Sequence, residues 1–342
     1  MKRLIIPAVL LAVLGLCLPA NAQFAKVGTV GFKFLDIGVG GRALAMGEAY
    51  SAVANDASAM FWNPAGVANV KQSDFFTGYT RWPAQINLYS VAGVTKTPMG
   101  HIGALFTILN TGLMNRTTAF DNDGKVSGTF AYEDWAAGLS YARYLTDRFA
   151  FGANFKIIRE KLADWDKTGW AVDIGTYYDT GFKSLRLGMA IMNFGPDMTF
   201  KIEDVDGVPV AAPYNGHPDG IDNNGDGFTD NDTKEMATPL PLAFRAGVAF
   251  DVIQTAASKF TLAAEVAHPS DNKERYNFGG EYWFQDLLAI RAGWKLNMDE
   301  GGFTAGAGIK LPISSFHASF DYAYNNLGLL EGVHRGSFSI AF

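Results

Sequence analysis

The chain has 342 residues and a formal net charge of −6, and 48% of the residues are hydrophobic, 13% aromatic and only 18% charged. This acidic balance excludes a nucleic-acid-binding protein, because such a protein needs a basic face. After residue 22 no stretch approaches 18 continuous apolar residues, so we expect no membrane-spanning helix. An apolar, aromatic chain without helical spans favours a transmembrane β-barrel.

The first 22 residues have the three parts of a secretory signal peptide. Lys2 and Arg3 are basic, residues 4–18 are apolar, and residues 20–22 (Ala-Asn-Ala) form a small-residue cleavage site. A retained membrane anchor is the alternative, but the apolar run is short for a span. Cleavage would also remove the only cysteine, Cys17, so we expect no disulfide and no thiolate metal site in the mature chain.

Residues 23–72 are rich in glycine and alanine and contain signals for helix starts. Asp56 is expected to cap a short helix over residues 57–61. Asn63-Pro64 is a second start, with Asn at the N-cap and Pro in the first turn. These signals favour an ordered segment over the alternative, an ordinary N-terminal linker.

From about residue 74 onward the sequence alternates between two kinds of side chain. In residues 287–296 the even positions are Leu, Ile, Ala, Trp and Leu, whereas the odd positions include Arg, Gly and Lys. A barrel strand in lipid needs this pattern, because successive side chains point to opposite faces. A soluble sandwich also alternates, but it does not need bulky aromatics on one face and so many glycines on the other. Fourteen strands are expected, over residues 74–80, 86–97, 100–110, 128–144, 147–160, 168–180, 183–195, 240–253, 258–268, 273–285, 287–296, 301–311, 315–326 and 332–342.

The connections between these strands alternate in length. Every second connection is a tight turn, and those between are mostly longer and more polar, as in outer-membrane barrels with short periplasmic turns. We therefore expect both chain ends on the periplasmic side. The last strand alternates to its end at Phe342 and resembles the assembly signal of bacterial outer-membrane barrels.

Fourteen strands enclose more space than their own side chains fill, so the lumen needs water or a plug. We expect residues 23–72 to fold into the periplasmic mouth of a barrel formed by residues 73–342. Met192 and Trp283 are weak indications of an apolar lumenal pocket. The charged residues of the lumenal faces indicate a mixed polar interior: Arg148, Lys156, Arg245, Arg291, Lys295, Asp173, Asp251, Glu265, Glu281 and Asp321.

Residues 196–239 form an acidic insertion that is much longer than an ordinary connection. Asp222, Asn224 and Asp226, followed by Gly227, match positions 1, 3, 5 and 6 of an oxygen-ligand calcium loop. Position 12 is Thr233 rather than Glu, and a solvated acidic loop is the alternative. The predicted calcium ligands are completed by the Phe228 carbonyl and Asp230, with Asp219 or Asp232 as the extra carboxylate.

Residues 40–50 read Gly-Gly-Arg-Ala-Leu-Ala-Met-Gly-Glu-Ala-Tyr, and residues 62–66 read Trp-Asn-Pro-Ala-Gly. This pattern resembles the N-terminal signature of the PorV/PorQ family, which belongs with the FadL-like fourteen-stranded outer-membrane barrels. The Asn-Pro-Ala-Gly element is shared broadly across FadL-like barrels. The resemblance implies that none of the signature residues is catalytic. It implies that the plug is shaped by Arg42, Gly47, Asp56, Asn63, Pro64 and Gly66.

The resemblance implies a barrel associated with type IX protein secretion, which binds or hands over secreted cargo at the cell surface together with other secretion components. The alternative is a FadL-like channel for the uptake of hydrophobic small molecules, which needs an apolar lumenal pocket. A hydrolase would need a nucleophile and a base near the rim, and the sequence shows no such pair, so we predict that the protein is not an enzyme. Either function places the protein in the outer membrane of a Gram-negative-type bacterium, in contact with lipid.

Overall fold

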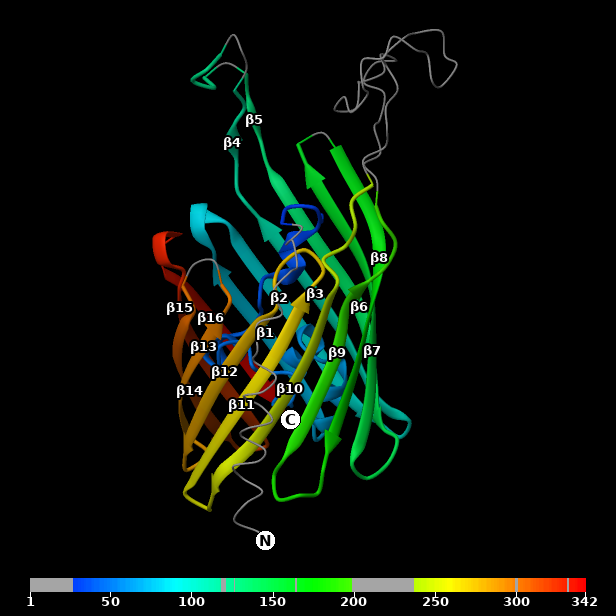
Figure 1. Ribbon diagram of the computed structural model, residues 1–342, viewed down its shortest axis with the longest axis vertical. Coiled ribbons are helices and arrows are strands. Elements are labelled where there is room, and N and C mark those ends of the chain that lie inside the picture. The colour runs from blue at the N-terminus through cyan, green and yellow to red at the C-terminus, as the bar shows by residue number, and fades with distance from the viewer. Residues whose placement is uncertain are drawn as a thin grey trace.

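The structure is a computed structural model, in which fourteen strands form one closed antiparallel barrel (Figure 1). The all-β barrel predicted from the alternation is therefore confirmed. The structure describes residues 27–117, 121–125, 127–163, 165–198, 237–298, 301–330 and 332–342. The barrel strands are β1 (Ser73–Arg81), β2 (Asn87–Thr97), β3 (Gly100–Asn110), β6 (Tyr132–Tyr144), β7 (Phe149–Leu162), β8 (Trp165–Asp179), β9 (Arg186–Phe194), β10 (Ala243–Gln254), β11 (Ser258–Pro269), β12 (Arg275–Phe284), β13 (Leu288–Leu296), β14 (Phe303–Ile313), β15 (Phe316–Asn326) and β16 (Gly332–Ala341).

Between β3 and β6 the chain forms a hairpin that the alternation pattern does not predict. β4 (Met114–Asn115) pairs with β5 (Thr129–Phe130), and in Figure 1 both lie beyond the rim of the barrel. The strand expected from residue 128 therefore enters the barrel only at Tyr132. The physical reason is that residues 129–130 pair within the hairpin and not with β3.

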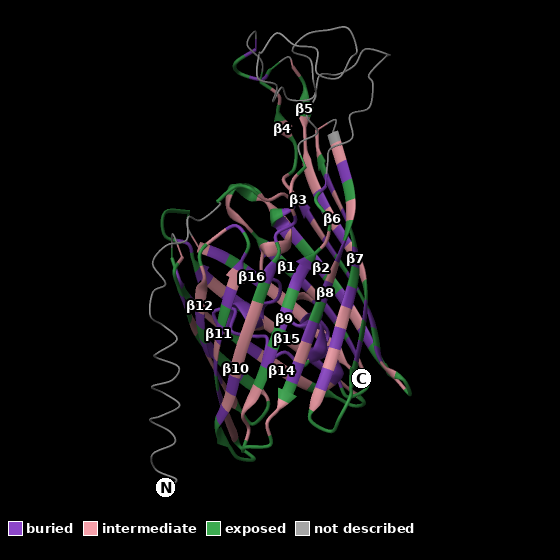
Figure 2. Ribbon diagram, turned by 45° about the vertical axis from the view of Figure 1, so that its right-hand side comes forward, coloured by how far each residue is buried: buried purple, intermediate pink, exposed green. Residues whose placement is uncertain are grey.

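Burial alternates along the barrel strands, as Figure 2 shows. In β13, Ile290 and Trp294 are 66% and 51% exposed, whereas Arg291 and Lys295 are each 4% exposed. Large apolar side chains thus cover the outside of the barrel, and charged side chains lie inside it. This arrangement fits a barrel whose outer wall contacts hydrocarbon.

The barrel closes where its first and last strands meet. β1 pairs with β16 from Asp74 opposite Ala341 to Arg81 opposite His334. Beyond that ladder, the N–H of Ser73 donates to the carbonyl of Phe342 (2.9 Å), and the N–H of Phe342 donates to the carbonyl of Ser73 (3.0 Å). Closure leaves no free strand edge at this seam.

The two ends of the barrel differ in their connections. At one end the strands are joined by short turns, such as residues 98–99, 255–257 and 314–315. At the other end lie the longer connections, including the β4–β5 hairpin (Figure 1). We call these the periplasmic end and the outer end, following the usual orientation of such barrels.

The segment before β1 forms short helical turns inside the barrel (Figure 1). We call residues 27–72 the plug. Its turns are η1 (Lys33–Asp36), α2 (Gly41–Ala45), η2 (Ala57–Phe61) and η3 (Pro64–Asn69). Two further turns, η4 (Pro83–Gln85) and η5 (Gly328–Leu330), lie in connections at the outer end.

The plug lies in the periplasmic mouth, where it was expected, but it also extends through the lumen to the outer end. At the outer end, the N–H of Gly31 donates to the carbonyl of Pro239 (3.0 Å), just before β10. At the periplasmic end, the N–H of Lys96 in β2 donates to the carbonyl of Gln72 (2.7 Å). The first described residues therefore lie at the outer end, although we expected that end of the chain on the periplasmic side. Periodicity shows that a segment lacks strands, but it does not show how far that segment reaches.

In the part of the chain that the structure describes, no helix is long and apolar enough to cross a membrane. The signal peptide predicted over residues 1–22 lies outside the described residues. The same holds for the calcium loop predicted over residues 219–232.

Candidate functional site

Arg42 of α2 anchors the plug to the barrel wall. Its Nε and Nη2 donate to the two carboxylate oxygens of Glu281 in β12, at 2.7 and 2.9 Å. Glu281 also accepts a hydrogen bond from Nε of Arg291 (2.7 Å), and Nη1 of Arg291 donates to Asp321 (2.7 Å). Burial alone would lower the pKa of Arg42, but Glu281 raises it well above its usual value. Such bidentate, charge-assisted bonds fix the geometry of a contact as well as its strength.

The same guanidinium also holds the plug together internally. Nη1 of Arg42 donates to Oδ1 of Asn55 (2.7 Å) and lies 3.5 Å from Oδ2 of Asp56. The hydroxyl of Tyr50 donates to Asp56 (3.0 Å), and Arg42 lies over the Tyr50 ring at 5.5 Å. Arg42 therefore joins three parts of the plug to one wall carboxylate.

A second ionic cluster surrounds Glu48, whose backbone adopts a left-handed conformation with φ of 66°. Nζ of Lys295 donates to Glu48 (2.9 Å), and Arg245 lies 4.0 Å from its other oxygen. Burial would raise the pKa of Glu48, but Lys295 and Arg245 lower it to about 2. Nearby, Glu265 accepts hydrogen bonds from Arg245 (2.8 Å) and from the N–H of Ser51 (2.8 Å). These wall charges hold the plug by its carboxylate and its backbone.

The two predicted helix caps lie within the plug. Asp56 accepts a hydrogen bond from the N–H of Ser58 at the start of η2 (3.0 Å). Asn63 accepts one from the N–H of Ala65 in η3 (3.1 Å), and Pro64 occupies the first position of that turn. The Asn63 amide also donates to the carbonyl of Thr176 in β8 (3.0 Å), so this cap joins the plug to the wall.

Glycines let the plug backbone approach the wall closely. A Cβ on Gly175 would overlap Oδ1 of Asn63, and a Cβ on Gly152 would overlap the backbone of Pro64. On the plug itself, Gly47 has φ of 62°, and an added Cβ would lie 2.8 Å from the carbonyl oxygen of Phe278. The predicted abundance of glycine on the lumenal face therefore has a structural cause.

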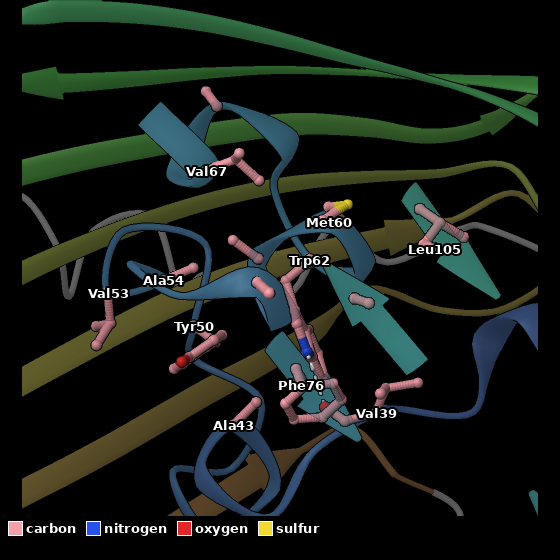
Figure 3. Packing of buried hydrophobic residues seen from close by; sticks show 14 of the residues in the cluster. Val39, Ala43, Tyr50, Val53, Ala54, Met60, Trp62, Val67, Phe76 and Leu105 are labelled. Atoms are coloured by element: carbon pink, nitrogen blue, oxygen red, sulfur yellow. Dashed lines mark hydrogen bonds between the residues drawn. The ribbon is translucent and has the colours of Figure 1, made fainter. Parts of the chain in front are cut away.

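The centre of the plug is a tightly packed aromatic and aliphatic cluster (Figure 3). Nε1 of Trp62 donates to the carbonyl of Val39 (2.9 Å), and Tyr50 meets Trp62 edge to face with centroids 6.0 Å apart. The Arg245 guanidinium lies over the Trp62 ring at 4.8 Å. Gly66 permits this packing, because a Cβ there would lie 2.7 Å from the carbonyl oxygen of Ala54. The cluster is closely packed, with Tyr50 fully buried and Trp62 only 1% exposed.

Above this cluster, toward the outer end, a cavity of about 50 Å³ lies between the plug and the wall. We call it the upper cavity. Leu35, Met60 and Met192 are among its apolar lining residues. The charged residues lining it from the wall are paired: Lys156 lies 2.8 Å from Asp173, and Arg245 donates to Glu265.

Below the cluster, toward the periplasmic end, a larger polar cavity of about 620 Å³ lies between the plug and strands β11 to β16. We call it the lower cavity. Charges of both signs line it, including those of Arg42, Asp56, Glu281 and Asp321. Arg42 and Glu281 form part of its wall, so plug movement at this pair would change its shape.

The outer end of the lumen is crossed by residues 31–36. The N–H of Phe32 donates to Glu160 of β7 (2.9 Å), and Nζ of Lys167 lies over the Phe32 ring at 4.7 Å. Across the mouth, Nζ of Lys33 lies 2.8 Å from Asp271 in the β11–β12 connection. This strap restricts access to the upper cavity from outside.

The structure brings all six predicted signature residues into the plug, although only Arg42 and Asn63 bond the wall by their side chains. The alternation of the strands places Glu281, Glu265 and Lys295 in a polar interior but does not identify their partners. Trp283 lies at 5.2 Å from Arg291 and not in the upper cavity. Arg148 is exposed in a periplasmic turn rather than lumenal, because β7 begins only at Phe149.

Within the described ranges, no group of three or more His, Cys, Asp or Glu side chains could hold a metal ion. The predicted ligands Asp222, Asn224, Asp226, Phe228 and Asp230 lie outside those ranges, as do Asp219 and Asp232. The calcium site therefore stays a prediction.

The closed antiparallel barrel, with apolar side chains outside and a plug inside, has the architecture of bacterial outer-membrane β-barrels. The family model for outer membrane protein transport proteins (OMPP1/FadL/TodX) matches residues 21–204, more than half of the chain, and the chain belongs to this family. It is therefore an outer-membrane protein of a transport family and not an enzyme. No curated protein matches the sequence.

Several solved structures have a similar fold. The toluene transporter TbuX of Ralstonia pickettii has a TM-score of 0.54 at 11% identity, covering 89% of this chain and 97% of TbuX. The toluene transporter TodX of Pseudomonas putida has a TM-score of 0.55 at 11% identity (87% and 96%). The CymD monoaromatic hydrocarbon channel has a TM-score of 0.54 at 12% identity (89% and 96%). The broader FadL-like assignment is thus confirmed, whereas the comparisons do not show a PorV/PorQ protein.

Proposed function

We propose that the protein is a channel that moves small, neutral, hydrophobic molecules across the outer membrane. The observation that carries this proposal is the upper cavity, which is lined by apolar side chains, by the neutral polar side chains of Thr107 and Asn193, and by paired charges. Because Lys156 and Arg245 already have carboxylate partners, neither is free to bind an acid such as a fatty acid. Family membership supports the proposal, as do the toluene and monoaromatic hydrocarbon transporters of similar fold.

The structure corresponds to a closed form of this channel. A volume of about 50 Å³ is well below the roughly 300 Å³ at the low end for ligand pockets. Binding therefore requires the plug residues on one side of the cavity, Phe34 to Val39, to move away from Met60 and Trp62. The strap over residues 31–36 is continuous with that segment, so both would move together.

Release through the barrel wall is the second part of the proposal. The β8–β9 ladder has a register shift between Val172 and Ile174, and Asn193 in β9 has φ of 61°. Met192 and Asn193 both line the upper cavity beside this irregularity. A bulged wall has fewer regular ladder bonds to break than an intact one. We therefore place the exit at β8 and β9.

A binding measurement on the purified protein tests the neutral-molecule proposal. Calorimetric titration in detergent should show binding of toluene and none of benzoate, which has the same ring and one negative charge. Leu105→Trp, which fills the upper cavity, should abolish toluene binding. Ala104→Phe, on the outward face of the same strand, is the matched control and should leave it unchanged. Equal binding of benzoate and toluene would contradict the proposal.

A reversible cross-link tests the exit. Val172 and Phe194 are register partners across the irregular ladder, and the chain has one native cysteine, in the predicted signal peptide. The variant Val172→Cys/Phe194→Cys should lose uptake of toluene when oxidised and regain it on reduction. The pair Phe320→Cys/Phe338→Cys, on the opposite side of the barrel, is the control and should transport in both states.

The second candidate is the type IX secretion role implied by residues 40–50. What favours it is the signature itself, but in the structure Arg42, Gly47 and Tyr50 are plug residues inside the lumen and are not at the outer surface. The signature is therefore accounted for by plug anchoring. Purification from native outer membranes separates the two functions, since co-purified secretion components or cargo would favour this one and a bound hydrophobic molecule the channel.

We also propose that the acidic insertion binds calcium, because Asp222, Asn224 and Asp226 have the spacing of an oxygen-ligand loop. Calorimetric titration with Ca²⁺ should show one site in the whole protein. Asp226→Asn should weaken it, whereas Asp123→Asn, in the β4–β5 hairpin connection, should not. Absence of heat in the wild-type titration would contradict the site.

A further inference from the structure

An apolar groove of about 700 Å³ crosses the outside of the barrel over the seam between β1 and β16. We call it the seam groove. Its floor includes Gly336, where an added Cβ would meet no atom within 4 Å. In register, Gly336 lies between Tyr79 of β1 and Tyr322 of β15. The next row toward the periplasmic end holds Phe320 and Phe338, whose ring centroids are 4.6 Å apart. The groove is thus a slot with aromatic walls that opens toward hydrocarbon.

The row on the other side, toward the outer end, is polar. Arg81 is the register partner of His334, and both side chains are exposed. The hydroxyl of Tyr322 lies 2.6 Å from Nδ1 of His334, which leaves Nε2 available to a ligand. Among the described residues, no carboxylate forms an ion pair with Arg81. The Arg81 guanidinium, which has no carboxylate partner in the described part of the chain, therefore lies at the outer end of the apolar slot.

We propose that the seam groove binds a phosphate-bearing lipid of the outer leaflet. One acyl chain occupies the slot over Gly336, and the phosphate contacts Arg81 and His334. Tyrosines at the boundary fit this depth, because aromatic girdles of barrels lie at the level of the lipid headgroups. Arginine is well suited to the contact, since its planar donors match phosphate oxygens. Charge complementarity favours an anionic amphiphile over a neutral one. The cation, the tyrosines and the apolar slot follow one another from the outer end inward, which matches the headgroup and acyl chain of a lipid. A protein partner would not need this order.

A second apolar groove on the same barrel is similar in volume to the seam groove but differs from it in the polar group beyond its outer end. This second groove has a volume of about 630 Å³ and lies over β10 to β14, with Gly280 among its lining residues. Beyond its outer end, Nδ1 of His268 lies 3.1 Å from a carboxylate oxygen of Glu274. The polar group there is already paired with an acid. The second groove is therefore expected to take acyl chains without selecting a phosphate.

Native mass spectrometry of the whole protein in detergent tests the proposal. The probes are lipid A with both phosphates and the same lipid A after enzymatic removal of its phosphates. The wild type should retain the phosphorylated form roughly tenfold better, as expected for charge-assisted hydrogen bonds. Arg81→Gln/His334→Gln should bind both forms equally, and Gly336→Phe should lose the preferred lipid altogether.

Matched variants exclude trivial causes. Arg143→Gln removes an exposed arginine from the periplasmic end of β6, and Gly280→Phe fills the second groove; both should keep the phosphate preference. Equal retention of the two lipids by the wild type would overturn the proposal. So would a dimer that disappears in Gly336→Phe, because a second copy of the chain would then occupy the groove. Heat-modifiable migration of each variant on gels verifies that the barrel has formed.

Discussion

The plug meets the barrel wall in different ways on opposite sides of the lumen. Against β7 and β8, η3 is fitted by shape: Gly152 and Gly175 admit its backbone, and the polar links beside it are the neutral amides of Asn63 and Asn154. Against β10 to β15, Gly279 and Gly293 also admit the plug backbone closely, but here the plug is held by charge in addition, through Glu281 and through the cluster around Glu48. Shape contacts do not depend on pH or salt, whereas ionic contacts can be released by protonation or by water. The η3 side therefore acts as the fixed side and the ionic side as the one that can open.

The largest increase in ion conductance is expected from a side chain that prevents the plug from packing against β7 and β8. Gly175→Leu places a side chain where Asn63 and Pro64 now lie, so the plug cannot seat. We expect an open lumen, measured as a large increase in ion conductance across planar bilayers. Gly93→Ala is the control, because a Cβ there would meet only Phe75, at 4.0 Å. If Gly175→Leu conducts no more than the wild type, the plug does not depend on this fit.

The next effect comes from the charged side. Glu281→Gln leaves Arg42 and Arg291 buried without their shared carboxylate, and losing one partner of a buried pair costs about 3–5 kcal/mol. The plug should then open frequently, with conductance above that of the wild type but below that of Gly175→Leu. Asp286→Asn removes an exposed carboxylate in a periplasmic turn and should have no effect. If Glu281→Gln conducts no more than Asp286→Asn, the plug is not held by the ion pair of Arg42 with Glu281.

The local structure of the plug could be anticipated from the sequence, whereas its contacts with the barrel wall could not. Helix caps are local signals, so Asp56 and Asn63 could be assigned from their own neighbours, and alternation shows which face of a strand is lumenal. The partner of Arg42 is 239 residues away along the chain. Periodicity places Glu281 inside the barrel but does not specify its height or the strand opposite it. The wall glycines were noticeable in the sequence, yet their purpose depends on a plug position that only the folded chain supplies.

Acid should release the charged side before the fixed side. The pKa of Glu48 is about 2, below its ordinary value of 4.5, because Lys295 and Arg245 outweigh the effect of burial. Its contribution to the closed state is therefore complete above about pH 4.5 and is lost as the pH falls through 2. The shift corresponds to about 3 kcal/mol. Wild-type conductance should rise over this window, whereas Glu48→Gln should already be raised at pH 7 and change less. A flat wild-type profile would show that Glu48 does not hold the plug.

The smallest effect is expected on the hydrogen exchange of the strap, because the ion pair between Lys33 and Asp271 is partly exposed to water. Lys33 is half-exposed, and its ion pair with Asp271 is worth at most about 1 kcal/mol and is screened by salt. Lys33→Gln should speed hydrogen exchange of residues 31–36 by up to about fivefold at low salt. Adding 0.5 M salt should bring the wild type close to the variant, because ions weaken an exposed pair and hardly affect the buried contacts of Arg42. Lys125→Gln, which loses an exposed pair with Asp123 outside the lumen, should leave that exchange unchanged. If neither Lys33→Gln nor salt changes the exchange rate, the strap is held by other contacts. These are the contacts of Phe32 with Glu160 and Lys167 on the β7–β8 side.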